Sequence, residues 1–152
     1  MTNADLLTVF DRLDRAGTWA YSYQQLRVLF RNETPGSFRK SLSLRAAEGI
    51  VLVQACRGLY VNRRATSLPD NVLPALVPYI RPHAFNYVSM ESVIGGTEDL
   101  SQIAGRLIVV STGRSAVIET PYGAIEFVRT RMCDVEDLEG LVMDEKSGLY
   151  YA

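Results

Sequence analysis

Residues 34–64 read TPGSFRKSLSLRAAEGIVLVQACRGLYVNRR, and the organisation of the whole chain follows from this stretch. Thr34 is a good helix N-cap, and Pro35 fits the first helical turn because its missing N–H would have no intrahelical partner there. Gly49 provides the left-handed conformation that ends many helices. The sequence therefore predicts a helix that begins at Pro35 and ends at Gly49.

Two β-rich runs follow this helix. Residues 50–54 and 59–64 are joined by a tight turn that ends with Arg57 and Gly58. The order helix, strand, basic turn, strand is typical of the end of a winged helix-turn-helix, in which the last helix reads DNA. We expect the helix and the turn to form the DNA-reading element.

The residues before this stretch complete the same motif. Apolar periodicity predicts helices over residues 4–16 and 23–30, with a short β-prone segment, 19–21, between them. A capping residue precedes each of the three helices: Thr2 or Asn3, Ser22, and Thr34. We therefore assign residues 1–66 to a winged helix-turn-helix DNA-binding domain.

The second half, residues 67–152, is predicted to be a small mixed α/β domain, so that the whole chain is α+β. Its secondary-structure signals are a helix over 71–80, a short helix over 89–94 ended by Gly95-Gly96, β-type runs at 106–112, 116–120 and 124–132, an acidic segment at 133–147, and a strand-like end at 148–152. Turn residues separate the three β-type runs, which lie close together in sequence. We expect these runs to form an antiparallel meander.

Charge is distributed unevenly along the chain. The net charge of −1 combines ten Lys/Arg and five Asp/Glu in residues 1–64 with six Lys/Arg and twelve Asp/Glu in residues 65–152. A balance of +5 beside one of −6 indicates that the first half meets a polyanion and the second does not. The content of 47% apolar and 22% charged residues is that of a globular protein.

Eight side chains are candidate DNA contacts: Gln24, Ser37, Arg39, Lys40, Ser43, Arg57, Arg63 and Arg64. Phe38, Leu42 and Ala46 recur every four residues and give the third helix one buried stripe. Arg39, Lys40 and Ser43 face away from this stripe. Arg39 or Lys40 can donate to guanine edges in the major groove, and Ser37 and Ser43 can reach phosphates or bases.

Several of these side chains have a plainer interpretation as well. Arg57 either meets the minor groove or backbone or is an ordinary turn residue. Gln24 either touches a phosphate or has no role, and Arg63 and Arg64 either follow the DNA backbone or solvate a linker. Arg45 lies nearer the buried stripe and can be a structural ion pair instead.

We find no catalytic, metal or cofactor site in the sequence. His83 is the only histidine, and Cys56 and Cys133 have neither metal-ligand nor disulfide spacing. Gly95-Gly96 does not form a phosphate cradle. No signal peptide or membrane-spanning run is recognised. The sequence therefore predicts a cytoplasmic protein that is not an enzyme.

Three segments carry a family resemblance. The run from Gly36 through Gly49-Ile50-Val51 to Val61 resembles the N-terminal winged helix of AbiEi-type antitoxins. Residues 87–94, Tyr-Val-Ser-Met-Glu-Ser-Val-Ile, look like the short helix that begins the second domain of that family. Residues 123–127 look like its later turn and strand, so the similarity is spread over most of the chain.

This resemblance implies a transcriptional repressor from a type IV toxin–antitoxin or abortive infection system. Such a repressor binds inverted repeats of double-stranded DNA in its own promoter and autoregulates its operon. Its functional partner is a nucleotidyltransferase-like toxin, and a stable complex is not required. In the family a strand like residues 148–152 leads into further helices, so we expect this chain to be either truncated or a short relative.

Two other functions stay open. The chain can be a winged-helix regulator whose C-terminal domain binds a partner or ligand, without antitoxin activity. It can also be an enzyme, such as a nuclease subunit, with its active site in the β-rich half. A nucleotidyltransferase-like protein in the neighbouring reading frame would favour the antitoxin.

Overall fold

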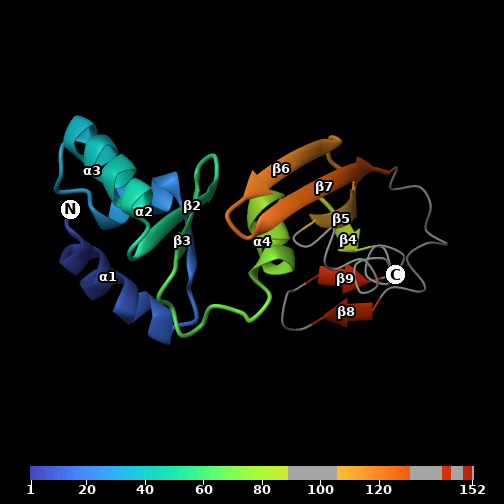
Figure 1. Cartoon of the computed structure of the whole chain (residues 1–152), viewed down its shortest axis with the longest axis horizontal. Coiled ribbons are helices and arrows are strands. Elements are labelled where there is room, and N and C mark those ends of the chain that lie inside the picture. The colour runs from blue at the N-terminus through green and yellow to red at the C-terminus, as the bar shows by residue number, and fades with distance from the viewer. Residues whose placement is uncertain (89–105, 131–141, 145–148, 152) are drawn as a thin grey trace. The chain divides into compact units, whose positions relative to one another are not determined.

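The chain consists of two compact units, Met1–Leu68 and Pro69–Ala152, each with its own sheet (Figure 1). The boundary lies close to the one placed at residue 66 from the sequence. The computed structural model describes residues 1–88, 106–130, 142–144 and 149–151. Both units combine helices with strands, which confirms the α+β class expected from the sequence.

The first unit has three helices and a three-stranded antiparallel sheet. Its elements in chain order are α1 (Asn3–Arg15), β1 (Ala20–Ser22), α2 (Tyr23–Leu29), α3 (Pro35–Glu48), β2 (Leu52–Cys56) and β3 (Leu59–Asn62). The sheet order is β1-β3-β2, so the last strand of the hairpin is central and the short first strand pairs with it. All the elements predicted from the sequence for this half are present, in the predicted order.

Local capping fixes the helix ends. Thr2 and Ser22 each form a capping box, with Asp5 and Gln25 respectively as the reciprocal partners. The hydroxyl of Thr34 accepts a hydrogen bond from the N–H of Ser37 at 3.4 Å. Gly49 ends α3 in the left-handed conformation with φ of 64°, as its sequence position predicts.

One hydrophobic core holds the three helices on the sheet. Its largest members that are almost fully buried are Leu6, Phe10, Leu26, Phe38, Leu42, Val51 and Leu52. The rings of Phe10 and Tyr21 stack with centroids 4.6 Å apart, which joins α1 to β1. Phe38 and Leu42 bring the inner face of α3 into the same core, and the outer face of α3 is left to solvent.

A clasp formed by Asp14, Thr66 and Ser67 closes the first unit after the hairpin. The carboxylate of Asp14 accepts hydrogen bonds from the backbone N–H and the hydroxyl of both Thr66 and Ser67, at 2.5–2.8 Å. The Ser67 hydroxyl, followed by the two backbone amides and the Thr66 hydroxyl, holds the pKa of Asp14 well below its usual range. The clasp explains why the first unit extends past the hairpin to Leu68.

We predict that Asp14→Asn lowers the stability of the first unit by about 1–2 kcal/mol, because charge-assisted hydrogen bonds are lost at a partly exposed site. A depressed pKa in the folded state stabilises it above the unfolded pKa of about 4, and this contribution is lost as pH falls toward the folded value. The difference between wild type and variant should therefore shrink below about pH 4. Urea unfolding at several pH values, followed by fluorescence of the single tryptophan, Trp19, measures it.

The matched control for this clasp is Asp11→Asn, which removes an exposed carboxylate from the same helix. It should change stability by no more than about 0.5 kcal/mol. An equal loss in both variants, or a difference independent of pH, would show that the clasp does not stabilise the unit.

The second unit contains one described helix and a six-stranded mixed sheet. Its elements are α4 (Val72–Ile80), β4 (Asn86–Val88), β5 (Arg106–Ser111), β6 (Ala116–Thr120), β7 (Gly123–Arg129), β8 (Val142–Asp144) and β9 (Leu149–Tyr151). The strand order is β6-β7-β5-β4-β9-β8. Strand β9 fits the predicted strand-like end, whereas β8 lies inside the segment that we expected to be only an acidic stretch.

The expected antiparallel meander is wrong in one of its pairings. β6 and β7 form the antiparallel hairpin, but β5 pairs with β7 in parallel and does not pair with β6. The link after β5 crosses the end of β7, where the hydroxyl of Ser115 accepts a hydrogen bond from the N–H of Arg129 at 3.0 Å. The third run therefore inserts between the first two.

Burial explains this insertion. β7 contributes Ile125 and Phe127, which are 0% and 1% exposed, whereas β6 has no buried residue and carries the exposed Glu119. A strand whose large apolar side chains are buried gains more from a central position, and a strand without buried residues is suited to an edge. The guanidinium of Arg81 covers the Phe127 ring at 4.2 Å from its centroid, which adds to the burial of β7.

A polar pair lies within the apolar core of the second unit. The hydroxyl of Ser111 donates to Oδ1 of Asn86 at 2.6 Å, and the amide of Asn86 donates to the carbonyls of Arg81 and Ala84.

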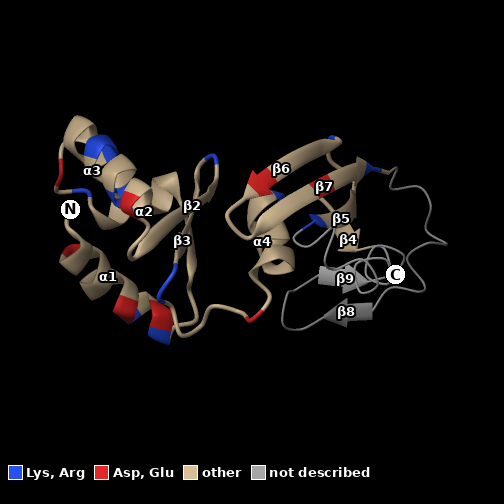
Figure 2. Ribbon diagram, in the orientation of Figure 1, with Lys and Arg blue, Asp and Glu red and all other residues tan. Residues whose placement is uncertain are grey.

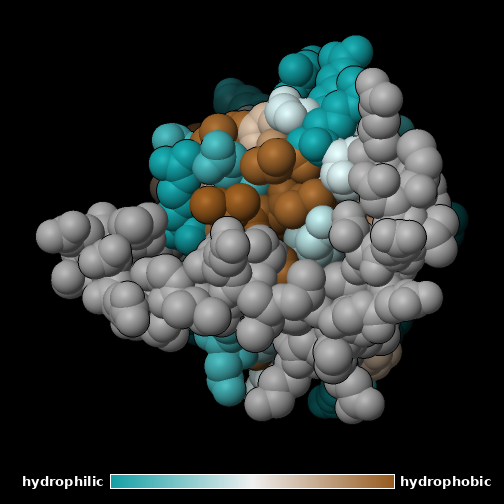
Figure 3. All heavy atoms as spheres, turned by 90° about the vertical axis from the view of Figure 1, so that its right-hand side faces the viewer, coloured by the Kyte–Doolittle hydropathy of each residue, from teal (hydrophilic) through white to brown (hydrophobic). Residues whose placement is uncertain are grey.

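Figure 3 shows hydrophobic side chains gathered on one face of this unit, beside a hydrophilic margin. The predicted helix at 89–94, Gly95-Gly96 and most of the acidic segment lie outside the described residues.

Candidate nucleic-acid interface

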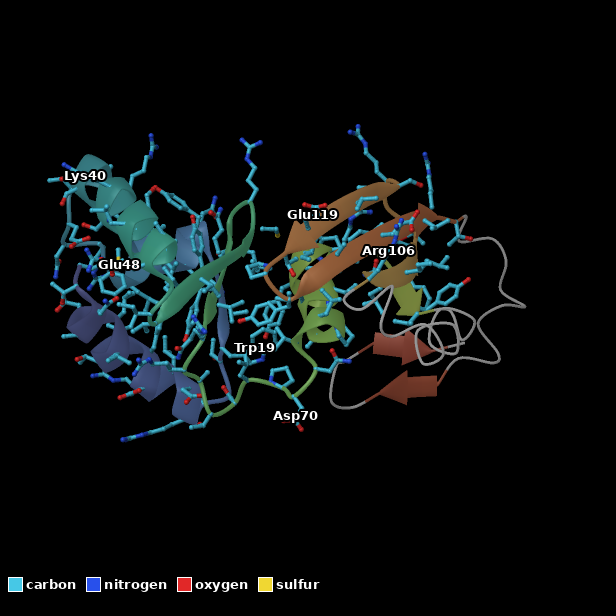
Figure 4. The ribbon with its side chains drawn as sticks, viewed as in Figure 1. Trp19, Lys40, Glu48, Asp70, Arg106 and Glu119 are labelled. Atoms are coloured by element: carbon cyan, nitrogen blue, oxygen red, sulfur yellow. The ribbon has the colours of Figure 1, made fainter. Side chains whose placement is uncertain are left out.

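The outer face of α3 lies opposite its buried stripe. With about 100° between successive residues, Lys40 lies about 160° from both Phe38 and Leu42 around the helix. Arg39 lies only about 100° from Phe38, at the margin of the exposed surface. Lys40 extends outward from the helix (Figure 4), and both side chains are exposed. Lys40 is therefore at the centre of the outer face and Arg39 at its edge.

The two candidate serines are also exposed on α3. Ser37 is in the first turn, where the positive end of the helix dipole favours an anion. Ser43 follows Lys40 by about one turn of helix. The sequence prediction that Arg39, Lys40 and Ser43 are exposed on this helix is confirmed, and Ser37 is exposed as well.

Arg57 lies at the tip of the β2–β3 hairpin and is exposed. Gly58, beside it, has φ of 76°, a conformation that allows the tight turn. The carbonyl of Gly58 accepts a hydrogen bond from the N–H of Tyr23 at 3.0 Å, which ties the hairpin tip to the start of α2. The tip therefore has a defined position in the unit.

Tyr23 links the two basic elements, and the sequence analysis did not identify it. Its backbone holds Gly58, and its ring packs edge-on against Phe38 of α3, with centroids 5.5 Å apart and an angle of 69°. Arg27 covers the same Phe38 ring at 5.4 Å. An aromatic residue directly after the Ser22 cap was the available signal, since apolar residues at helix starts often pack on neighbouring elements.

Arg63 and Arg64 take structural roles at the end of α3. Nη1 of Arg63 donates to the carbonyl of Gly49 at 2.8 Å, and Nε of Arg64 donates to the carbonyl of Ile50 at 3.2 Å. Cations near the last carbonyls of a helix also interact favourably with its dipole. We therefore leave both arginines out of the proposed contact surface.

Gln24 lies on α2 and away from α3. It lines a hollow of about 490 Å³ together with residues of α1, β1 and α2, among them Leu13, Tyr21 and Val28. The structure therefore groups Gln24 with an apolar surface depression and not with the basic side chains of α3.

Positive charge on α3 and at the hairpin tip lies along one side of the first unit (Figure 2). None of the ion pairs between described residues involves Arg39, Lys40 or Arg57. Arg45, in contrast, pairs with Glu48 at 3.3 Å, and Glu48 also accepts from Asn3 of α1 at 3.2 Å. The structural role considered for Arg45 is thus confirmed, and Arg39, Lys40 and Arg57 are available on this side of the unit to contact a polyanion.

Other chemistry has little support among the described residues. They contain no group of three or more His, Cys, Asp or Glu side chains arranged to hold a metal ion. Burial raises the pKa of the Cys56 thiol, which lowers its reactivity at neutral pH. In the part of the chain that the structure describes, no helix has both the length and the apolar character needed to cross a membrane.

Comparisons with protein-family models, with curated proteins and with solved structures found no match.

Proposed function

We propose that the first unit is a winged helix-turn-helix that binds double-stranded DNA. The observation that carries this proposal is the set of three exposed cations, Arg39, Lys40 and Arg57, on two elements joined through Tyr23. In this arrangement α3 enters the major groove, and the β2–β3 hairpin is the wing, with Arg57 on the adjacent backbone or minor groove. Lys40 faces base edges, whereas Arg39 and Arg57 contact phosphates.

A DNA-binding unit joined to a second, acidic unit fits a transcriptional repressor acting in the cytoplasm. The resemblance to AbiEi-type antitoxins supplies a more specific proposal, a repressor of its own toxin–antitoxin operon with a nucleotidyltransferase-like toxin as functional partner. Co-expression tests this part: the chain should restore growth of cells that express such a toxin from the neighbouring reading frame. Growth arrest that persists, while repression is intact, would leave a regulator without antitoxin activity.

DNA binding itself is tested with the full chain and a fluorescent random-sequence duplex. Two cations that neutralise phosphates, Arg39 and Arg57, should give a slope of log K against log salt of about −2, at roughly −0.9 per contact. Fluorescence anisotropy between about 50 and 200 mM salt measures this slope. Binding that does not depend on salt would contradict the proposal.

Two triple variants of equal net charge distinguish binding through α3 and the hairpin tip from a general attraction between a basic protein and DNA. Replacing Arg39, Arg57 and Lys40 with alanine should abolish most of the salt-dependent affinity. Replacing Arg12, Arg15 and Arg114, which are also exposed, changes the net charge equally and should leave the slope unchanged. Equal losses in the two triple variants would show that α3 and the hairpin are not the contact surface.

A further inference from the structure

Leu44 is a large apolar side chain on the outer face of α3, and it is 49% exposed. Exposed apolar residues are common on protein surfaces, so exposure alone carries no meaning. The position of Leu44 is what matters here. It follows Lys40 by four residues, and residues four apart are neighbours on one helix face. Leu44 lies within about 40° of Lys40 around the helix.

Most of the other residues of this face are small. Gly36, Ser43 and Ala47 lie three, four or seven residues from Lys40. Glu48, four residues after Leu44, is the long exception, and its carboxylate pairs with Arg45 and accepts from Asn3. The small residues beside Lys40 and Leu44 allow the backbone of α3 to come close to a groove floor. A molecule bound to this face would contact the cationic end of Lys40 and the apolar end of Leu44.

The major groove offers a matching pair of features. Guanine presents the O6 and N7 acceptors that suit lysine, and thymine presents its 5-methyl group, an apolar feature of the groove. Four residues separate Lys40 from Leu44, a rise of about 6 Å, which is between one and two base-pair steps of about 3.4 Å. The tips can therefore reach two bases that are neighbours or nearly so.

We propose that Leu44 is a specificity residue that contacts the 5-methyl group of a thymine, one or two base pairs from a guanine contacted by Lys40. This inference rests on the proposed DNA-binding function. It deepens that function by naming the chemical group that the apolar side chain recognises. The positive charge of Arg39, Lys40 and Arg57 favours DNA over an apolar protein partner at this face.

The experiment uses the full chain and duplexes that the wild-type chain enriches from a randomised library. The enriched duplexes are amplified once with thymidine triphosphate and once with deoxyuridine triphosphate, which removes the 5-methyl groups and leaves base pairing intact. Wild type should bind the uracil form about fourfold more weakly for each methyl group contacted, as expected for one buried methyl-sized group. Leu44→Ala should bind the thymine form at least about fourfold more weakly than wild type and show no thymine preference.

Two variants provide matched controls. Ile50→Ala and Val28→Ala remove apolar side chains that are 47% and 66% exposed but lie off the outer face of α3. Both should keep the wild-type ratio of thymine to uracil affinity. Leu44→Met, which retains an apolar tip of similar size, should restore most of that ratio.

Three results would overturn the proposal. If the wild-type chain binds the thymine and uracil forms with equal affinity, Leu44 makes no contact with a methyl group, although the chain still binds DNA. If Leu44→Ala keeps the preference for thymine, that preference comes from the shape of the DNA and not from Leu44. A Leu44→Ala variant that loses affinity equally for both forms and has a lower mass in light scattering would assign Leu44 to a contact between copies. Failure to enrich any duplex would refute DNA binding itself, which separates the two claims.

Discussion

Replacing Phe38 with alanine should destabilise the first unit by about 3–5 kcal/mol, the usual cost of deleting a large buried aromatic side chain. Phe38 is fully buried, its ring and the Tyr23 ring pack in a T-shaped arrangement, and Arg27 lies over its face. The loss is comparable with the whole stability of many small domains. Urea unfolding followed by Trp19 fluorescence measures it, and DNA binding should be lost together with the fold.

Phe38→Leu is the control, because it keeps an apolar side chain of intermediate volume and should lose much less stability than Phe38→Ala. Val28→Ala changes an exposed apolar residue of the same unit and should stay within about 0.5 kcal/mol of wild type. If Phe38→Ala unfolds within 1 kcal/mol of wild type, the packing of α3 on α2 is not what holds the helix in place.

Lys40→Ala should lower the preference for the enriched duplexes over random duplexes by about 1–3 kcal/mol, or roughly fivefold to 150-fold. The reason is the position of Lys40 at the centre of the outer face, where a side chain reaches base edges. Stability should change by no more than about 0.5 kcal/mol, since the side chain is exposed. Anisotropy titrations with both kinds of duplex, together with urea unfolding, measure the two effects.

Arg39→Ala is the informative comparison, since Arg39 lies at the margin of the same helix. A phosphate contact should weaken binding to all sequences about equally and reduce the salt slope by about one. Lys40→Ala should therefore lower sequence preference, whereas Arg39→Ala should lower affinity for all sequences. Unchanged binding in both variants would show that α3 does not enter the groove, and the partner-binding alternative would then be favoured.

The sequence was most informative where structure is set by near neighbours. Thr2, Ser22 and Thr34 cap helices whose first turns lie within three residues of them, and Gly49 ends α3 through its own backbone conformation. Such signals can be recognised without knowing the fold. The bounds of the three helices of the first unit consequently lie within a residue of those expected. A difference of one residue is the usual uncertainty in where a helix ends.

Pairings between distant residues had no comparable signal. The turn residues 113–115 predict that the chain reverses after β5, but they do not say which strand becomes its neighbour. The position of β7 between β5 and β6 depends on the burial of Ile125 and Phe127 against the rest of the unit. The bonds from Thr66 to Asp14 join residues 52 positions apart, so no local pattern announces them.

For the candidate interface, the sequence predicted which element carries the basic residues but not where every cation points. Arg39, Lys40 and Arg57 are exposed as expected, because helical periodicity and the hairpin tip determine their direction. Arg63 and Arg64 instead bond to carbonyls that β3 brings close to them. That proximity follows from strand pairing, which sequence periodicity does not reveal.

The clasp at Asp14 also sets the reach of the chain beyond the first unit. It immobilises Thr66 and Ser67, so that only residues 68–71 connect it to α4. This connection spans at most about 14 Å when fully extended. A tether of this length gives the second unit an effective concentration of millimolar order at any molecule that the first unit binds. If the first unit binds DNA as proposed, a molecule held by the second unit meets the neighbouring DNA as an intramolecular event.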